Sequence, residues 1–130
     1  MQIPFDPRAI EEMLRVRNSK WTVAVVLKLR TGSHRFGELR REIGVSQKTL
    51  TATLRALERD GLLSRTSYAT IPPRVDYALT ELGLEALRVF EAWEQFAVRH
   101  WAEVLASRRR FDAAEGSDPA VARHIDYSRD

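Results

Sequence analysis

The sequence predicts a mainly α-helical, α+β fold with one small β-hairpin. Apolar residues recur at spacings of three and four through most of 7–60 and again through 80–106, as in amphipathic helices. Between these stretches, over 62–79, the spacing changes to two, as in half-buried strands. With 130 residues, the chain has room for one domain, and the absence of cysteine excludes disulfides and thiol-based metal sites and redox switches.

The first two helices are bounded by residues that favour helix ends. Asp6 precedes Pro7, which suits an N-cap followed by the first helical position. Asn18-Ser19 is expected to interrupt this helix. A second helix then begins near Lys20 and stops at Thr31-Gly32-Ser33.

A pair of helices joined by a tight turn comes next. The first member covers Phe36 to Ile43, and Gly44-Val45 forms the turn. Ser46 is a favourable N-cap for the second member, which runs from Gln47 to Asp60 and ends at Gly61, an expected C-cap residue.

The hairpin consists of strands at Leu62–Thr66 and Arg74–Leu79, joined by a loop whose end Pro72-Pro73 makes stiff and extended. Thr80 then caps a long helix that continues to about Ala106. We therefore expect one domain over residues 1–106. Residues 107–130 are polar with little pattern, and we expect a mobile tail there.

This order of elements is that of a winged helix-turn-helix, whose second helix enters the DNA major groove. At 100° per residue, Leu50, Leu54 and Leu57 lie within about 60° of one another, so they predict the buried side of that helix. The opposite side carries Lys48, Ala52, Arg55 and Arg59. Such a face is also the ordinary solvated surface of many helices, and the alternative function is a winged helix that binds an acidic protein partner without DNA.

The residue types on this face suit duplex DNA. Gln can pair with adenine, and Arg or Lys can pair with guanine or neutralise phosphate. The predicted base contacts are Gln47, Lys48, Thr51 and Arg55. The predicted contacts to the DNA backbone are Arg40, Arg41, Ser46, Arg65 and Arg74.

The charge distribution agrees with this orientation. The net charge is +3. Residues 33–79 hold eight cationic and five acidic side chains, whereas 80–105 hold two and five. A polyanion is therefore expected to approach the helix-turn-helix rather than the long last helix.

The long last helix carries more apolar side chains than one small domain can cover. We expect it to form a homodimer through Leu87, Phe90, Trp93, Ala97, Trp101 and Val104. The competing hypothesis is a pocket for a small-molecule effector, lined by Trp21, Phe90 and Phe96.

Enzyme activity is not expected. The three histidines, His34, His100 and His124, are scattered, and no nucleophile elbow, phosphate loop or metal-binding motif is present, so no cofactor or metal is predicted. The chain begins without a secretory signal and has no apolar run of about 20 residues. A soluble, cytoplasmic protein is expected.

Several segments together resemble the HxlR-type winged-helix regulators, which are related to the MarR group. The resemblance covers about residues 6–105, and its most specific part is Pro72-Pro73-Arg74-Val75-Asp76-Tyr77. The other segments that carry it are Lys20-Trp21-Thr22, Arg35-Phe36-Gly37-Glu38-Leu39-Arg40-Arg41, Ser46-Gln47-Lys48-Thr49-Leu50-Thr51 and Leu54 to Leu63.

The resemblance implies a homodimeric transcription regulator, more often a repressor, that is held together by its first and last helices. It also marks departures from the family pattern. Asp6 stands roughly where members often have a cysteine, which in several of them senses oxidants or electrophiles, so thiol sensing does not carry over. Asn18-Ser19 replaces the usual Gly-Gly, Ala52 replaces a polar residue, and the turn before Ser46 is one residue shorter.

Overall fold

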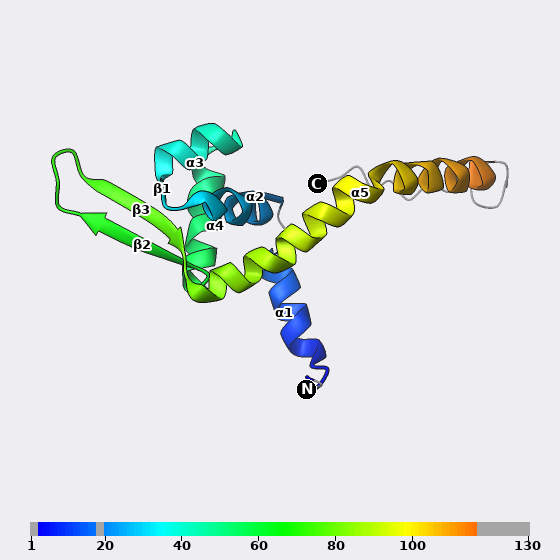
Figure 1. The fold of residues 1–130 in the computed structure, drawn as a ribbon, viewed down its shortest axis with the longest axis horizontal. Helices are drawn as coiled ribbons and strands as arrows, with labels where there is room; N and C mark the ends of the chain where they lie inside the picture. Colours follow the sequence, from blue (N-terminus) through cyan, green and yellow to red (C-terminus); the bar gives the residue numbers. More distant parts are fainter. Residues whose placement is uncertain (1–2, 18–19, 117–130) are drawn as a thin grey trace. The chain divides into compact units, whose positions relative to one another are not determined.

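The computed structural model describes residues 3–17 and 20–116, which form two compact units that meet between Ala92 and Trp93 (Figure 1). The elements are α1 (Pro7–Arg17), α2 (Lys20–Lys28), the 3-10 turn η1 (Leu29–Thr31), β1 (His34–Arg35), α3 (Phe36–Ile43), α4 (Gln47–Arg59), β2 (Leu63–Tyr68), β3 (Arg74–Leu79) and α5 (Glu81–Gly116). The predicted Asn18-Ser19 break and the end of the predicted tail, residues 117–130, lie outside the described residues.

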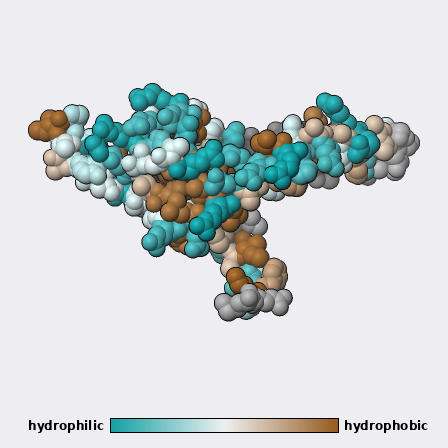
Figure 2. All heavy atoms as spheres, viewed as in Figure 1, coloured by the Kyte–Doolittle hydropathy of each residue, from teal (hydrophilic) through white to brown (hydrophobic). Residues whose placement is uncertain are grey.

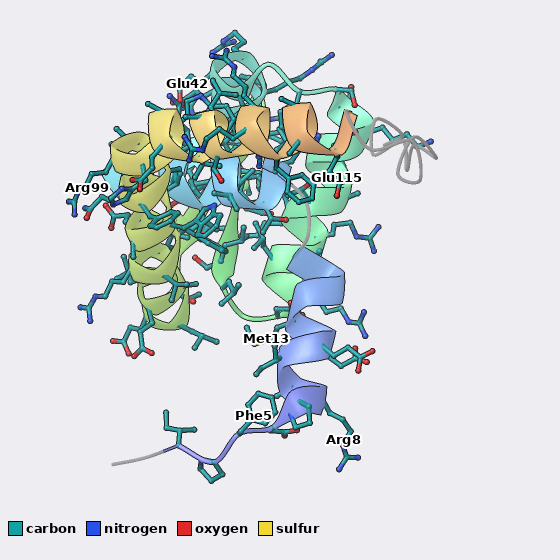
Figure 3. All side chains as sticks on the ribbon, turned by 90° about the vertical axis from the view of Figure 1, so that its right-hand side faces the viewer. Phe5, Arg8, Met13, Glu42, Arg99 and Glu115 are labelled. Carbon is teal, nitrogen blue, oxygen red and sulfur yellow. The ribbon has the colours of Figure 1, made fainter. Side chains whose placement is uncertain are left out.

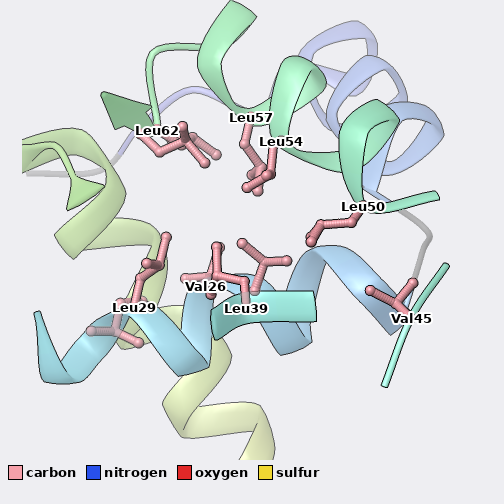
Figure 4. Close-up of a cluster of buried hydrophobic side chains, with 11 residues drawn as sticks. Val26, Leu29, Leu39, Val45, Leu50, Leu54, Leu57 and Leu62 are labelled. Atoms are coloured by element: carbon pink, nitrogen blue, oxygen red, sulfur yellow. The ribbon is translucent and has the colours of Figure 1, made fainter. Parts of the chain in front are cut away.

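The core of the first unit lies between α2, α3 and α4 (Figure 4). Val26 of α2, Leu39 of α3 and Leu50 of α4 are fully buried there. Burying a leucine or valine side chain stabilises a fold by about 1.5–3 kcal/mol, so this small cluster fixes how the three helices pack. Helix α4 therefore has one side sealed and one side free.

The predicted cap of the first helix and the predicted turn at Gly44 are confirmed, whereas the C-cap of α4 is Asp60 rather than Gly61. The Asp6 carboxylate accepts from the backbone N–H groups of Arg8 at 3.0 Å and Ala9 at 3.4 Å, at the start of α1. Between α3 and α4, Gly44 is left-handed at φ 73°, a conformation that costs glycine nothing. These local choices fix where the helices begin and end.

The sheet has three strands in the order β1-β3-β2, all antiparallel, where the sequence predicted two. His34 and Arg35 pair with Tyr77 and Asp76, adding a strand of two residues, too short to show any periodicity. As the central strand, β3 is half-buried from Val75 to Leu79, and Tyr77 and Leu79 of its predicted apolar face pack against the core. Strand β2 also extends two residues past its predicted end at Thr66.

Helix α5 begins where the sequence predicted but does not end at Ala106. Thr80 Oγ1 accepts from the N–H of Gly83 at 3.0 Å, which confirms Thr80 as the cap, and it donates to the carbonyl oxygen of Gly61. The helix continues to Gly116, because residues 107–115 are mostly Arg, Ala and Glu, which are strong helix formers. The first ten residues of the predicted tail are therefore helical.

No helix within 3–17 or 20–116 has both the length and the hydropathy that a membrane span requires.

Candidate nucleic-acid interface

Helix α4 presents its polar side to solvent, as predicted. Leu50, Leu54 and Leu57 are buried together with Thr53, whose hydroxyl donates to the carbonyl oxygen of Thr49 at 2.8 Å. The four predicted base-contacting residues, Gln47, Lys48, Thr51 and Arg55, are all exposed. They share one face of α4 with Ala52 and Arg59, which are also exposed. These six residues form the α4 face.

The guanidinium group of Arg55 is not neutralised by a neighbour. Glu58, Asp60 and Glu38 are the acidic side chains with which the sequence would allow it to pair, yet within 3–17 and 20–116 Arg55 forms no ion pair. Its positive charge is therefore available to a ligand at the surface.

The N-terminus of α4 is capped but still offers donors. Ser46 Oγ accepts from the N–H of Thr49 at 3.2 Å and donates to Thr49 Oγ1 at 3.0 Å. The hydroxyl predicted to contact a phosphate is thus engaged inside the molecule. The first N–H groups of a helix have no partner within it, so those of Gln47 and Lys48 suit an anion better than the Ser46 side chain does.

A hollow of about 370 Å³ separates α4 from the sheet. Its walls include Arg55 and Glu58 of α4, and Arg65 and Tyr77 of the strands. The fold thereby brings Arg55 and Arg65 to one depression, although they lie on different elements. The sequence placed both residues in the site but gave no sign that they share a hollow, because that depends on how the sheet packs beside α4.

The predicted backbone contacts on α3 are exposed as well. Arg40 and Arg41 lie in the last turn of this helix, and neither forms an ion pair within the described residues. The Nη1 atom of Arg41 lies 3.8 Å from the position a Cβ would take at Gly37. Arg41 therefore extends back along its own helix.

Arg74 is held next to the tip of the wing, the hairpin of β2 and β3, where it pairs with Tyr68. Its Nε and Nη2 donate to the two carboxylate oxygens of Asp76 at 3.0 and 2.8 Å, and its guanidinium lies 4.7 Å from the ring centre of Tyr68. The hydrogen bonds from Arg74 lower the pKa of Asp76, and the same bonds raise the pKa of Arg74. The sequence predicted Arg74 as a DNA contact but missed both partners.

The predicted dimer residues divide between two environments. Leu87 is 7% exposed and belongs to the core, and Phe90 packs against that core. Leu87 is therefore not available to a second subunit. By contrast, Trp93 is 64% exposed and Trp101 51% exposed, Ala97 is exposed, and Val104 is half-buried.

The start of the chain is also apolar and exposed. Phe5 and Met13 lie on one side of α1, and Arg8 points to the other (Figure 3). Ile3 and Ile10 add to the exposed apolar side chains of this segment. None of the described residues of the first unit covers them.

The predicted effector pocket stays a prediction. Trp21 and Phe90 are partly buried against the core of the first unit. Phe96 stacks on Trp93 in the second unit, with ring centres 5.6 Å apart. Among the residues that the structure describes, no group of three His, Asp or Glu side chains is placed to hold a metal ion.

Comparison with known proteins agrees with this architecture. The family model described as HxlR-like helix-turn-helix matches residues 16–106. The uncharacterised HTH-type transcriptional regulator YtfH of Escherichia coli is 44% identical over 98 residues, which cover 75% of this chain and 78% of that protein.

Solved structures give the same result. The putative transcriptional regulator ytfH of Salmonella typhimurium has a TM-score of 0.70 at 42% identity, covering 77% of this chain and 90% of that one. A putative regulator of the MarR family from Porphyromonas gingivalis has a TM-score of 0.66 at 30% identity, covering 75% of this chain and 97% of that one.

Proposed function

Because this chain belongs to the HxlR-like helix-turn-helix family, it is a transcriptional regulator, and we propose that it is a repressor that binds a near-palindromic operator as a homodimer in the cytoplasm. The observation that carries the proposal is the α4 face. A helix sealed on one side by leucines presents uncompensated cationic and amide side chains on the other. These are the groups that form hydrogen bonds with base edges.

In this proposal α4 lies in the major groove. Gln47, Lys48, Thr51 and Arg55 contact bases, and the free N–H groups at the start of α4 contact a phosphate. Arg40 and Arg41 contact the DNA backbone from α3, and Arg65 from the sheet. The hollow between α4 and the sheet then accommodates a sugar–phosphate strand between Arg55 and Arg65. Arg74 has further N–H groups to contact a phosphate near the tip of the wing.

The homodimer is supported by the apolar side chains that the single chain leaves uncovered. Trp93, Ala97, Trp101 and Val104 follow one another at helical spacings on α5. Burying two tryptophans against a second copy removes a large apolar area from water. A two-fold dimer presents two α4 helices about 34 Å apart, which predicts operator half-sites one DNA turn apart.

The test begins by selecting bound fragments from random duplex DNA with the full-length protein. Affinity for the selected site is then measured by fluorescence anisotropy at several salt concentrations. We expect Arg55→Ala to weaken specific binding by about 1–3 kcal/mol and Arg41→Ala to weaken all sequences and flatten the salt dependence. Arg88→Ala is the matched control, since it removes the same charge from an exposed helical position outside the α4 face.

Two results would count against this proposal, and the second would favour the alternative function. If the double variant Lys48→Ala, Arg55→Ala binds selected DNA as tightly as the wild type, the α4 face does not contact bases. If the wild type shows no salt-dependent retention on mixed DNA at all, the protein-binding winged helix becomes the better hypothesis.

A further inference from the structure

A second hollow, of about 520 Å³, lies between the start of α3 and the end of the wing. One side is formed by Arg35, Phe36 and Gly37, and the other by residues 70–75. It shares only Phe36 with the hollow beside α4. Its volume suits a small molecule, because such sites typically measure about 300–1,000 Å³.

The lining of this second hollow is largely apolar. Phe36 is half-buried and packs against the core, and Val75 of β3 is half-buried as well. Pro72 and Pro73 contribute apolar rings and have no backbone N–H group. Figure 2 shows the end of the wing as hydrophobic and the surface of α3 as mostly hydrophilic. A ligand with an apolar body would therefore gain from leaving water here.

The charged residues in this lining are both cations, Arg35 and Arg74. Their acidic neighbours, Glu38 and Asp76, line a smaller hollow of about 160 Å³, to which both arginines also contribute. The two arginines therefore stand between these carboxylates and the larger hollow. An anion in the larger hollow meets positive charge and no carboxylate in the lining.

Neither guanidinium group needs to give up a partner in order to bind an anion. Arg74 donates from Nε and Nη2 to Asp76 and lies over the ring of Tyr68, which leaves the N–H groups of Nη1 for a ligand. Arg35 is exposed and forms no ion pair within 3–17 and 20–116. A site whose cations are already placed loses less free energy to ordering when it binds.

We propose that this second hollow is an effector site for a small organic acid with an apolar body. The carboxylate lies between Arg35 and Arg74, and the apolar body packs between α3 and residues 70–75. A DNA phosphate has no apolar part, so it fills this hollow less well. Because Arg74 is also a proposed phosphate contact, the bound acid competes with the operator. That regulatory consequence rests on the proposed function, whereas the binding of the acid does not.

An NMR titration of the full-length protein with cyclohexanecarboxylate measures both affinity and location, through the shifts of backbone amides. We expect saturable shifts at Gly37 and Val75. Cyclohexylmethanol lacks the charge and acetate lacks the apolar body, so each should bind at least about tenfold more weakly. Arg35→Gln should weaken binding of the acid about tenfold and leave binding of the alcohol unchanged. Arg99→Gln, the same change at an exposed position of α5, is the control.

Each of four results would overturn the proposed site. The first is the absence of saturable shifts with cyclohexanecarboxylate. The second is shifts centred on Trp21 and Phe90, which belong to the other predicted effector pocket. The third is equal affinity for the acid and the alcohol, and the fourth is unchanged binding of the acid by Arg35→Gln.

Operator binding tests the regulatory consequence. Cyclohexanecarboxylate should weaken binding of the wild type to the selected operator, whereas sodium acetate at the same ionic strength should not. Arg35→Gln should lose less of its own operator affinity when the acid is added. Unchanged operator affinity at a saturating concentration of the acid would overturn the effector role and leave the proposed function intact. If the wild type selects no DNA, the proposed function and the effector role fail together, while the titration still decides whether the hollow binds the acid.

Discussion

Two helical segments of this protein carry apolar residues at the same kind of spacing, with opposite results. In α4 the leucines are buried, and Leu50 and Leu57 have no exposed surface. In α5 beyond Ala92, none of the described residues is buried, although Trp93, Phe96, Trp101 and Phe111 lie there. Helical periodicity thus indicates that a face will be covered, but not by what.

The difference divides the chain into a part with a buried core and a part whose apolar side chains stay exposed in the single chain. The first unit has a core shared by α2, α3 and α4. The described part of the second unit is the remainder of one helix, whose exposed aromatic side chains contact neighbours on the same helix, as in the Trp93–Phe96 stack and the Arg108 guanidinium over the ring of Trp101. Folding of the first unit and burial of the second are therefore expected to respond to different substitutions.

The largest effect is expected from truncation of the core. Leu50→Ala removes a fully buried side chain between α4 and α2, and should lower the free energy of unfolding by about 4 kcal/mol. Thr51→Ala, the exposed next residue of the same helix, should change it by less than about 0.5 kcal/mol. Urea denaturation followed by circular dichroism measures both. Similar values for the two would mean that this side of α4 is not sealed.

The next effect concerns the junction between the wing and α5. A methyl group at Gly83 would overlap the carbonyl oxygen of Leu62, which already accepts from the N–H of Thr80. Because backbone rather than a flexible side chain must move, Gly83→Ala should cost about 3 kcal/mol.

Gly37→Ala is the control for that substitution. A methyl group at Gly37 meets only Arg41 Nη1, at 3.8 Å, so alanine should stabilise α3 by about 0.5–1 kcal/mol. Thermal denaturation of both variants should show shifts of opposite sign. A neutral Gly83→Ala variant would contradict the tight contact at Leu62.

Charges on the uncovered stripe of α5 should separate the subunits while leaving the core folded. We expect the wild type to sediment as a dimer and the double variant Trp93→Asp, Trp101→Asp as a monomer, since carboxylates cannot be buried against a second apolar helix. Its unfolding midpoint should also lose any dependence on protein concentration. Gln95→Asp, on the opposite side of α5, should leave the mass unchanged. An unchanged mass for the double variant would refute this interface.

The smallest effect on stability should come from the charge of Asp76 in the wing, which acid removes. Because Arg74 lowers the pKa of Asp76 in the folded state, the ion pair stabilises the fold above the ordinary aspartate pKa. This contribution disappears as the pH falls through the lowered value. Asp76→Asn should therefore be less stable than the wild type at pH 7, and the two should converge near pH 2. If the two proteins differed in stability by the same amount at pH 7 and pH 2, the carboxylate charge would not be the cause of the difference.

Local sequence signals predicted the helix-turn-helix almost to the residue. The bounds of α3 and β3 are as predicted, and α4 ends one residue earlier than expected. These elements are set by neighbours in the chain: Ser46 caps α4, Gly44 takes the left-handed turn, and Thr80 caps α5. Where the end of a helix depends on a hydrogen bond between residues a few positions apart, the local sequence is enough to predict that end.

The predictions that failed concern features that depend on residues far away in the sequence. Strand β1 forms because His34 and Arg35 pair with Tyr77 and Asp76 of β3. Two residues are too few to show the alternation that predicts a strand. Leu87 has the spacing of an interface residue, but it belongs to the core of its own chain. The continuation of α5 to Gly116 was missed because its last ten residues lack an apolar stripe.

The sequence by itself determined the order of helices, turn and hairpin, and which side of α4 is apolar, because caps and periodicity act over a few residues. Only the tertiary structure decided that Arg55 and Arg65 share one hollow, that Arg74 is bound to Asp76 and Tyr68, and that Trp93 and Trp101 stay uncovered. The physical reason is that the partners of a charged or aromatic side chain depend on which elements the packing brings beside it, and no local pattern specifies that.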